Sequence, residues 1–572
     1  TGHRRLGGRG HPVIAMTAGR VAPVAEQNRL GYLSGWVCQV AQNLRHWRFF
    51  ATPYGMFPLR WVVMTATASS YESQPVLAHS QPDWRRLVEV LTMGFVGSLM
   101  VTLWGWGSPQ GGMPAHVRPI GVVVALGGIA GLIVMIIAWL RSRKLVGRRV
   151  LILIVWSLPL VFSPPLLSQD GWAYAAQGWI LTQGMDPYLV PQGLAEALGK
   201  AVDTPWQETT AVYPPGSLWI QAAMVKIAHA DPMRSVMLMR VPAVIGIALM
   251  VWAVPRLARY AGTDPDHALW LAVCCPLTTL SAVGGMHNDG LQVGLSLSAL
   301  VVAVRLALIG RGWLGLVFGG ALVGLAGSVK QPGVLAGVGV VALVHVNAVR
   351  HGGRQWSTRN CWSALFARIA AGAIPALAVF GGISAIHGLG LGWLNSTAGS
   401  PVSVTSDSPI AFVVQILRGS GGVPLDKLVG PATGVSLVLT VAAMIWCWVR
   451  WGPIPPCRLG LGRITSRSRD LDNAGTGQIG SPLRLQAGVM IVFAAFGASL
   501  QPWYLIGPLA LLASVQLRRT HRDVVIGGVV ATAILTMMQW YWSPYVCLPL
   551  VIAGYLIVWR VPKLWAFVTA AN

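Results

Sequence analysis

Charged residues are scarce in this chain. Asp, Glu, Lys and Arg make up 10% of its 572 residues, and only 18 residues are acidic, whereas 54% are hydrophobic. The mean hydropathy is +0.59. A soluble protein of this size cannot keep so much apolar side chain away from water, so the composition excludes an ordinary soluble fold.

Cysteine is also rare. The seven cysteines are an odd number, and they form neither a disulfide framework nor a set with metal-ligand spacing. We therefore expect no metal and no cofactor. A cleavable signal peptide is not evident. Residues 1–85 are irregular and contain Arg, which is typical of a mostly disordered cytoplasmic tail.

Long apolar runs recur through residues 86–572, which we expect to form one transmembrane domain. The runs are continuously apolar rather than alternating, which indicates helices and not a β-barrel. The sequence therefore predicts an all-α polytopic membrane protein. We place fourteen spans at 90–106, 119–140, 150–167, 235–254, 268–284, 291–309, 313–329, 333–348, 366–389, 431–449, 486–500, 504–517, 524–540 and 545–560.

Basic residues gather in every second loop between the predicted spans, beginning with the loop 141–149. This bias marks the cytoplasmic side. The formal net charge of +24 thus indicates topology. We expect no nucleic-acid partner, because no basic cluster is interleaved with exposed aromatic residues in a soluble domain. This alternation of inner and outer loops holds only if residues 214–234 do not cross the membrane. We therefore predict an interfacial or re-entrant helix at 216–230 and a second interfacial helix at 410–417.

The polar motifs fall on the opposite, outer side. Asp170 follows the apolar run 150–167 by about one turn, which places its carboxylate at headgroup depth, within reach of a lipid-linked phosphate. A transporter would keep such groups near mid-bilayer. An enzyme acting on a lipid-linked substrate would collect them at one interface, as this sequence does. The spans are nearly free of charge, and the exception toward the outer side is Arg240, about one turn inside the outer end of its span.

Simpler interpretations exist for several motifs. The triplet His287-Asn288-Asp289 could cap the helix that follows it. Gln501-Pro502-Trp503-Tyr504 could belong to an aromatic belt at the membrane surface. Lys330 could be a membrane anchor, and Arg240 could extend its side chain to the outer surface.

Four segments carry a resemblance to a known family. They are Asp170…Tyr174…Gln177-Gly178, Gly184-Met185-Asp186-Pro187-Tyr188, Tyr213-Pro214-Pro215-Gly216 and His287-Asn288-Asp289. Together they resemble the polyprenol-phosphate-mannose-dependent α-1,6-mannosyltransferases of mycobacteria and corynebacteria (MptA/MptB type), which are GT-C glycosyltransferases. The resemblance covers roughly 150–504.

The resemblance implies a GT-C-like bundle of about 13–14 transmembrane helices with a catalytic outer first loop at 169–234. It implies Asp170 as general base, a polyprenyl-phosphate mannose donor and a lipomannan- or lipoarabinomannan-type glycolipid acceptor, at the outer face of the cytoplasmic membrane. GT-C enzymes often carry two acids in the first-loop motif. Here Gln169 precedes the single acid Asp170, which fits a metal-free site.

The chemistry of such a donor suggests roles for the other polar residues. A departing phosphate needs cationic partners or hydrogen-bond donors, and the candidates are Lys330, Arg240 and His287. Sugar or acceptor contacts are expected from Tyr174, Gln177, Asp186, Tyr188, Tyr213, Asn288, Asp289, Gln331, Trp503 and Tyr504. Attack opposite the phosphate would invert the anomeric centre, so a β-linked mannosyl phosphate would give an α-mannoside, and the resemblance implies that the link is α-1,6.

Two alternatives remain open on the sequence alone. The first keeps the GT-C fold but uses another polyprenyl-phosphate sugar, such as arabinose, or a protein hydroxyl as acceptor. The second is a transporter of lipid-linked sugars across the membrane.

Overall fold

The structure is a computed structural model that describes residues 84–108, 121–351, 358–386, 388–395, 408–419, 421–453, 479–497, 500–541 and 544–560. The tail predicted for residues 1–85 lies almost wholly outside these ranges. Within them every regular element is a helix, which confirms the all-α polytopic prediction.

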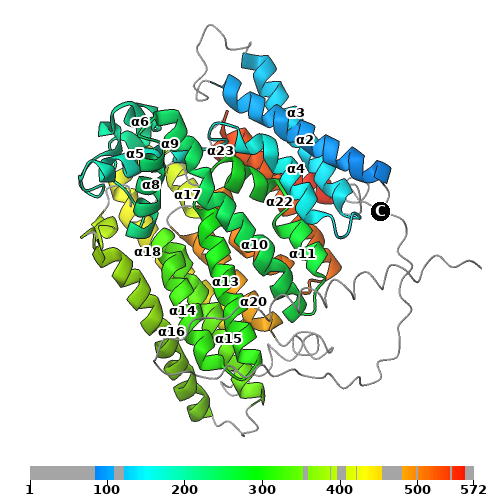
Figure 1. Ribbon diagram of the computed structural model, residues 1–572, viewed down its shortest axis with the longest axis vertical. Coiled ribbons are helices and arrows are strands. Elements are labelled where there is room, and N and C mark those ends of the chain that lie inside the picture. Colours follow the sequence, from blue (N-terminus) through cyan, green and yellow to red (C-terminus); the bar gives the residue numbers. More distant parts are fainter. Residues whose placement is uncertain are drawn as a thin grey trace, which may run out of the picture. The chain divides into compact units, whose positions relative to one another are not determined.

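Nine helical segments in the described ranges are long and apolar enough to cross a membrane. The helices that form them are α2 (Trp84–Gly107), α3 (Gly121–Ser142), α10 (Arg240–Tyr260), α13 (Asp289–Leu308), α14 (Gly312–Val329), α15 (Ala336–His351), α16 (Thr358–Ile386), α18 (Leu425–Trp451) and α22 (Arg519–Gln539). Each coincides with a predicted span. Figure 1 shows α10, α13, α14, α15 and α16 running beside one another through the bundle.

A bent pair of helical segments meets the same length and hydropathy criteria when its two halves are taken together. It comprises α11 (Pro265–Ala272), α12 (Pro276–Thr278) and the π-helical turn η5 (Thr279–Gly284), with a bend of 50° between its two halves. Pro276 stands at the break, where its ring and missing N–H prevent the first helix from continuing. The second half leads directly into the His287-Asn288-Asp289 turn.

Four other predicted spans correspond to apolar helices that are shorter than the nine segments above. The apolar segments at 150–167, 486–500, 504–517 and 545–560 correspond to α4 (Arg149–Val161), α20 (Gly480–Phe496), α21 (Ile506–Ala513) and α23 (Pro544–Arg560). The helices at 150–167 and 504–517 end earlier than predicted, whereas those at 486–500 and 545–560 are two residues and one residue longer than predicted. In α4 the cause is visible in the sequence, because Pro159 lies in its last turn and Pro164-Pro165 follow its end.

Short helices form the predicted outer loop. They are η4 (Gln192–Leu194), α5 (Asp170–Thr182), α6 (Glu196–Ala201), α7 (Thr204–Gln207), α8 (Pro215–Ile227) and α9 (Pro232–Leu238). Helices α5, α6, α8 and α9 gather at one end of the bundle (Figure 1). Helix α8 lies where an interfacial or re-entrant helix was expected, and α17 (Pro409–Gly419) lies at the second such position.

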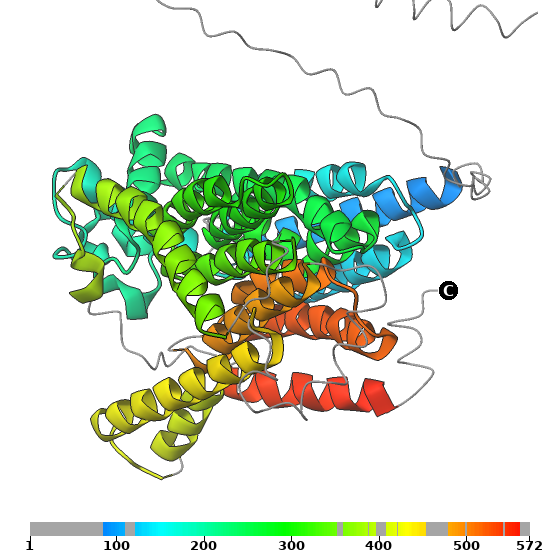
Figure 2. The same ribbon diagram turned by 90° about the horizontal axis from the view of Figure 1, so that it is seen from below.

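Aromatic stacking and one buried ion pair join α3, α4 and α11. The rings of Trp139 and Trp270 stack with centroids 4.7 Å apart, and each indole N–H donates to the other residue's carbonyl. Nε of Arg149 lies 2.7 Å from Oδ2 of Asp266. By contrast, α18 and α23 lie at one side of the bundle in Figure 2, and only 6% of the apolar window of α18 is buried, as suits a helix that faces lipid.

Glycines allow α10 and α13 to cross in close contact. A Cβ atom on Gly246 would lie 2.2 Å from the carbonyl oxygen of Gly290, and one on Gly294 would lie 2.6 Å from the carbonyl oxygen of Gly246. Small residues permit this approach between helices in a membrane, where packing rather than the hydrophobic effect drives association. The crossing fixes the beginning of α13, which carries Asp289.

Replacing Gly246 with Ala should destabilise the protein, because the new methyl group meets backbone that cannot move aside. We expect Gly246→Ala to lower the free energy of unfolding by about 1–3 kcal/mol. The matched control is Gly127→Ala in α3, where an added Cβ meets no atom within 4 Å. Thermal unfolding in detergent would test this; equal midpoints for the two variants would contradict the proposed packing role.

Candidate active site

Asp170 is the first residue of α5, and a tight turn delivers it there. Leu167, three residues earlier, has a φ of +61°, a backbone conformation that non-glycine residues rarely adopt. The hydroxyl oxygen of Ser168 accepts a hydrogen bond from the Asp170 backbone N–H at 3.1 Å. The side chain of Asp170 remains 29% exposed, so a substrate can reach it.

A second tight turn delivers His287 to the same place. Met286, just before it, has a φ of +58°. The two turns are joined through their backbones, because the N–H of Leu166 donates to the carbonyl of Gly284 at 3.1 Å. Two buried apolar residues in left-handed conformations beside polar residues are a sign of a functional site.

The two turns bring the imidazole of His287 against the carboxylate of Asp170. Nδ1 of His287 lies 3.2 Å from Oδ2 of Asp170, an ion-pair contact when the imidazole is protonated, although the ring nitrogen has no well-aligned hydrogen bond. Burial acts to raise the pKa of the Asp170 carboxyl, but the interaction with His287, followed by those with Lys330 and Ser168, outweighs burial and holds that pKa below its usual value. Asp170 is therefore ionised at neutral pH.

Tyr174 connects Asp170 to the second turn. Its hydroxyl lies 3.2 Å from Oδ2 of Asp170 and 3.4 Å from Oδ1 of Asn288. Burial, reinforced by Tyr213 and Asp170, raises the pKa of the Tyr174 phenol well above its ordinary value, so it remains a hydrogen-bond donor. Nδ2 of Asn288 in turn lies 3.4 Å from the hydroxyl oxygen of Ser217.

Lys330 lies beside this cluster, between α14 and the 3₁₀ turn η6 (Gln331–Leu335). Its ammonium group is buried and lies 2.6 Å from Oδ2 of Asp289. It also lies over two aromatic rings, 4.5 Å from the centroid of Tyr504 and 5.9 Å from that of Tyr213. Burial alone would lower the pKa of Lys330, but Asp289 outweighs it and the net shift is upward, so this lysine is a permanent cation.

Aromatic rings complete one wall. The ring of Trp503, in the 3₁₀ turn η9 (Pro502–Leu505), stacks on His287 with centroids 3.7 Å apart. Tyr213 meets Tyr174 edge to face at 5.3 Å. Segments that are hundreds of residues apart in the sequence thus meet around Asp170.

Three other predicted residues make contacts that support the outer loop. Oδ1 of Asp186 accepts a hydrogen bond from the backbone N–H of Tyr188, whose hydroxyl donates to the carbonyl of Tyr213 at 2.8 Å. The side-chain amide of Gln331 donates to the carbonyl of Val212. These contacts hold the loop in place over the bundle.

Two motif glycines also have packing roles. A Cβ on Gly178 would lie 2.6 Å from the backbone of Gln221 in α8, and one on Gly216 would lie 2.5 Å from the hydroxyl of Ser328 in α14. Beside Gly178, Oε1 of Gln177 is buried and has no hydrogen-bond partner. Gly178 thus lets α5 pack on α8, and Gly216 lets the outer loop pack against α14, the helix that ends beside Lys330.

Arg240 does not lie where a donor phosphate could use it. Its guanidinium is buried and donates to a ring of backbone carbonyls and one hydroxyl. These acceptors are the carbonyls of Val161, Ser163, Pro164, Val283 and Gly284 and the hydroxyl of Ser163. The structure thus corrects the expected phosphate contact, because within the described residues these oxygen acceptors all belong to the two segments that lead to Asp170 and His287.

Sequence reasoning missed three contributors. Ser163 and Ser217 give no sequence signal of their own, although Ser217 follows the Pro-Pro-Gly motif directly. Asp203, in the outer loop, is close enough to Asp170 to be affected by its charge: burial and then the negative charge of Asp170 raise the pKa of Asp203, while a backbone hydrogen bond opposes them. Among the residues that the structure describes, no three His, Cys, Asp or Glu side chains are grouped to hold a metal ion.

Comparison with known proteins points to one family. The MptA_B family, described as "Alpha-(1->6)-mannopyranosyltransferase, N-terminal domain", matches residues 90–346. An α-(1→6)-mannopyranosyltransferase A of Mycobacterium tuberculosis is 32% identical, over 75% of this chain and 80% of that protein. A probable α-(1→6)-mannopyranosyltransferase of Mycolicibacterium smegmatis is 30% identical, over 72% of this chain and 74% of its own length. No solved structure matches the chain.

The Arg240 contacts predict a large loss of stability when the guanidinium is removed. Each buried carbonyl left without a donor costs about 1–3 kcal/mol, so Arg240→Leu should lower the free energy of unfolding by about 3 kcal/mol or more. Arg256→Leu is the matched control, because Arg256 lies on the same helix and contacts the carbonyl and ring of Trp252 within it. Arg240→Leu protein that unfolds at the temperature of the control would contradict this role.

Proposed function

The chain belongs to the MptA/MptB family of α-(1→6)-mannopyranosyltransferases, and from this membership we propose that it transfers mannose from polyprenyl-phosphate mannose to a mannan glycolipid. The protein is a multi-pass membrane mannosyltransferase. The identity of the donor, a lipomannan-type acceptor and a site at the outer face of the cytoplasmic membrane are parts of the proposal. The observation that carries it is the meeting of Asp170, His287 and Lys330 at one end of a bundle of apolar helices.

Asp170 serves as the general base in this proposal. The contacts of His287 and Tyr174 to its carboxylate both use Oδ2, and Oδ1 is the proposed acceptor of the proton from the acceptor hydroxyl. As the hydroxyl oxygen attacks C1 of mannose, its proton passes to Asp170. The bond from C1 to the phosphate oxygen breaks, and the polyprenyl phosphate departs with the electron pair. Attack from the opposite face inverts the anomeric centre.

Lys330 and His287 are the proposed partners of the phosphate. Lys330 is cationic and buried, and a charge in such a place acts strongly on the negative charge that grows on the departing oxygen. His287 is held in place by Trp503 on one side and Asp170 on the other. Tyr174, Tyr213, Asn288 and Tyr504 belong to the same cluster of contacts and are proposed to contact the sugar or the acceptor.

Replacing Asp170 with Asn tests the base directly. General-base catalysis contributes roughly 10²–10⁴-fold, so Asp170→Asn should lower kcat for mannose transfer by that factor. The assay uses the purified protein, polyprenyl-phosphate mannose, a short α-mannoside acceptor and a chelator. The matched control is Asp231→Asn, because Asp231 caps α9 in the same loop and Asn caps a helix equally well.

Each outcome of this assay bears on a different part of the proposal. Wild-type activity that survives the chelator and disappears only in Asp170→Asn supports the reaction, the base and independence from metal. Folded Asp170→Asn protein with the rate of the control would exclude Asp170 as base. Wild-type turnover with a different polyprenyl-phosphate sugar, and none with mannose, would overturn the donor.

The contact between His287 and Asp170 predicts the acid limb of the pH profile. The depressed pKa keeps Asp170 ionised, so loss of the base should limit kcat/KM only below about pH 4. In His287→Phe the ring can still stack on Trp503, but the strongest interaction that lowers the pKa of Asp170 is gone, so that pKa rises although Lys330 and Ser168 still oppose burial. The acid limb of kcat/KM should move to higher pH. Trp503→Phe is the control, because it leaves the contact in place; a limb that moves equally in both variants would refute this account.

A further inference from the structure

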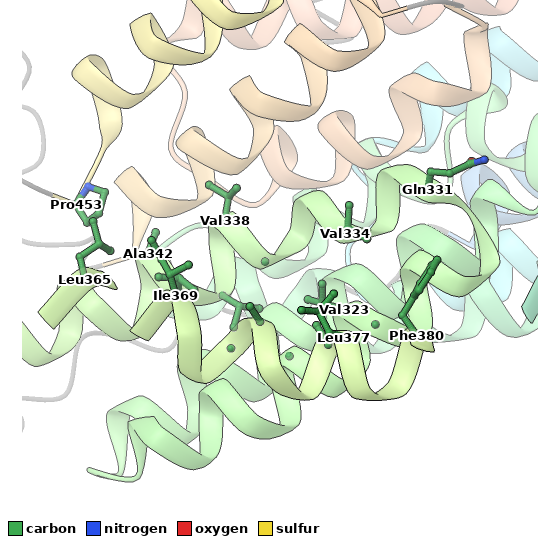
Figure 3. Close-up of a pocket in the computed structure, with 18 of the residues that line it drawn as sticks. Val323, Gln331, Val334, Val338, Ala342, Leu365, Ile369, Leu377, Phe380 and Pro453 are labelled. Atoms are coloured by element: carbon green, nitrogen blue, oxygen red, sulfur yellow. The ribbon is translucent and has the colours of Figure 1, made fainter. Parts of the chain in front are cut away.

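An apolar groove lies between α14, α15 and α16. It encloses about 570 Å³. Figure 3 shows side chains from all three helices facing this space. The residues that define its walls include Val323, Val334, Val338, Ile369, Leu377 and Phe380. Close contact between α14 and α16 shapes one wall, because a Cβ on Gly324 would lie 2.2 Å from the carbonyl oxygen of Ala376.

The two ends of the groove differ. At one end lies Gln331, the only lining residue with a side-chain amide, directly after Lys330 in the chain. At the other end lie Leu365 and Pro453 (Figure 3). The stretch of α16 from Leu365 to Phe380 measures about 23 Å at 1.5 Å per residue, which is most of the thickness of a bilayer's hydrocarbon core.

The polar end also contains an unpaired hydrogen-bond donor. Nε1 of Trp393, in the 3₁₀ turn η7 (Gly392–Asn395), is buried and has no partner. Trp393 lines the groove and meets the ring of Phe380 edge to face at 6.4 Å. A buried N–H without an acceptor is costly, so a ligand with an oxygen atom at this end would satisfy it. The neighbouring Gly392 packs on the ring of Tyr188 from the outer loop.

We propose that this groove binds the polyprenyl chain of the lipid-linked donor, with the phosphate at the Lys330 end. The proposal rests on the proposed function. A polyprenyl chain is attached directly to the phosphate that departs, so it must leave the site next to the group that holds that phosphate. The lipid of a mannan acceptor is separated from the reacting hydroxyl by the sugar chain and has no such constraint. The groove has the required apolar walls, and its polar end is one residue from Lys330.

Two glycines allow the groove to be filled without disturbing the helices. A Cβ on Gly337 would meet only a methyl group of Val323 at 3.8 Å, and a Cβ on Gly372 would meet only side-chain atoms of Val341 and Leu316 at 3.5 and 3.8 Å. Both glycines line the groove. The matched control is Gly382→Leu on α16, where an added Cβ meets no atom within 4 Å and which does not line the groove.

The test compares KM for a long-chain polyprenyl-phosphate mannose with KM for a two-isoprene analogue. In Gly337→Leu and Gly372→Leu the ratio of the long-chain KM to the short-chain KM should rise about tenfold, the effect of losing contacts equivalent to about two methylene groups. In Gly382→Leu the ratio should stay at the wild-type value. An unchanged ratio in groove variants that unfold at the wild-type temperature would overturn the proposal, as would a rise in the KM for the acceptor alone.

Binding of polyprenyl phosphate without mannose separates this proposal from the proposed function. Native mass spectrometry of the full-length protein in detergent should show bound polyprenyl phosphate, weakened in Gly337→Leu and retained in Gly382→Leu. That result would support binding of the polyprenyl chain in the groove. If the wild-type protein then transferred no mannose, only the proposed function would be refuted. Equal binding by both variants, or displacement of polyprenyl phosphate by excess phospholipid in both, would overturn the proposal that this groove binds the polyprenyl chain.

Discussion

The active-site cluster depends on one buried side chain that takes no direct part in it. The guanidinium of Arg240 gathers the carbonyls of two segments, 161–164 and 283–284, which enter the site from different helices. Neither segment is helical enough to satisfy these carbonyls itself, and lipid offers no donors. Because Arg240 has several donors in a fixed planar arrangement, it can join both segments at once. Asp170 and His287 lie a few residues beyond this junction, so their separation follows from it.

Strained backbone and close packing of glycines also fix the positions of the active-site residues. Leu167 and Met286 hold left-handed conformations that cost free energy, and the buried surroundings of both residues maintain them. Gly178 then lets α5 pack on α8, Gly216 lets the outer loop approach α14, and Tyr174 of α5 contacts Asn288 in the second turn. The polar groups that result are fixed by backbone on several sides, which is what catalysis by preorganised charge requires.

Hydropathy predicted the helical segments, and loop charge predicted that the polar motifs lie at one end of the bundle. Both properties depend on local composition, which the sequence shows directly. They failed where the outcome depends on partners distant in the sequence. Arg240 looked like a cation for phosphate because a sequence does not reveal which carbonyls lack donors. Ser217 and Trp393 belong to no periodic pattern. Span lengths were overestimated at 150–167, where proline ends α4 early although the residues stay apolar. The groove was equally hidden, because Gly and Val on α14 and α15 are ordinary residues of any span.

Lys330 does not meet a phosphate as an isolated cation, because its ammonium group already contacts Asp289. An ammonium group has three N–H donors, so a phosphate can bind beside that carboxylate, but it then shares the cation with another negative charge. Asp289 stands in the first turn of α13, where the helix dipole favours negative charge. In the proposed reaction the donor is a phosphodiester with a single negative charge, and the departing polyprenyl phosphate is a monoester that carries more. The shared cation therefore attracts the leaving group more strongly than the intact donor, which is the difference that speeds bond breaking.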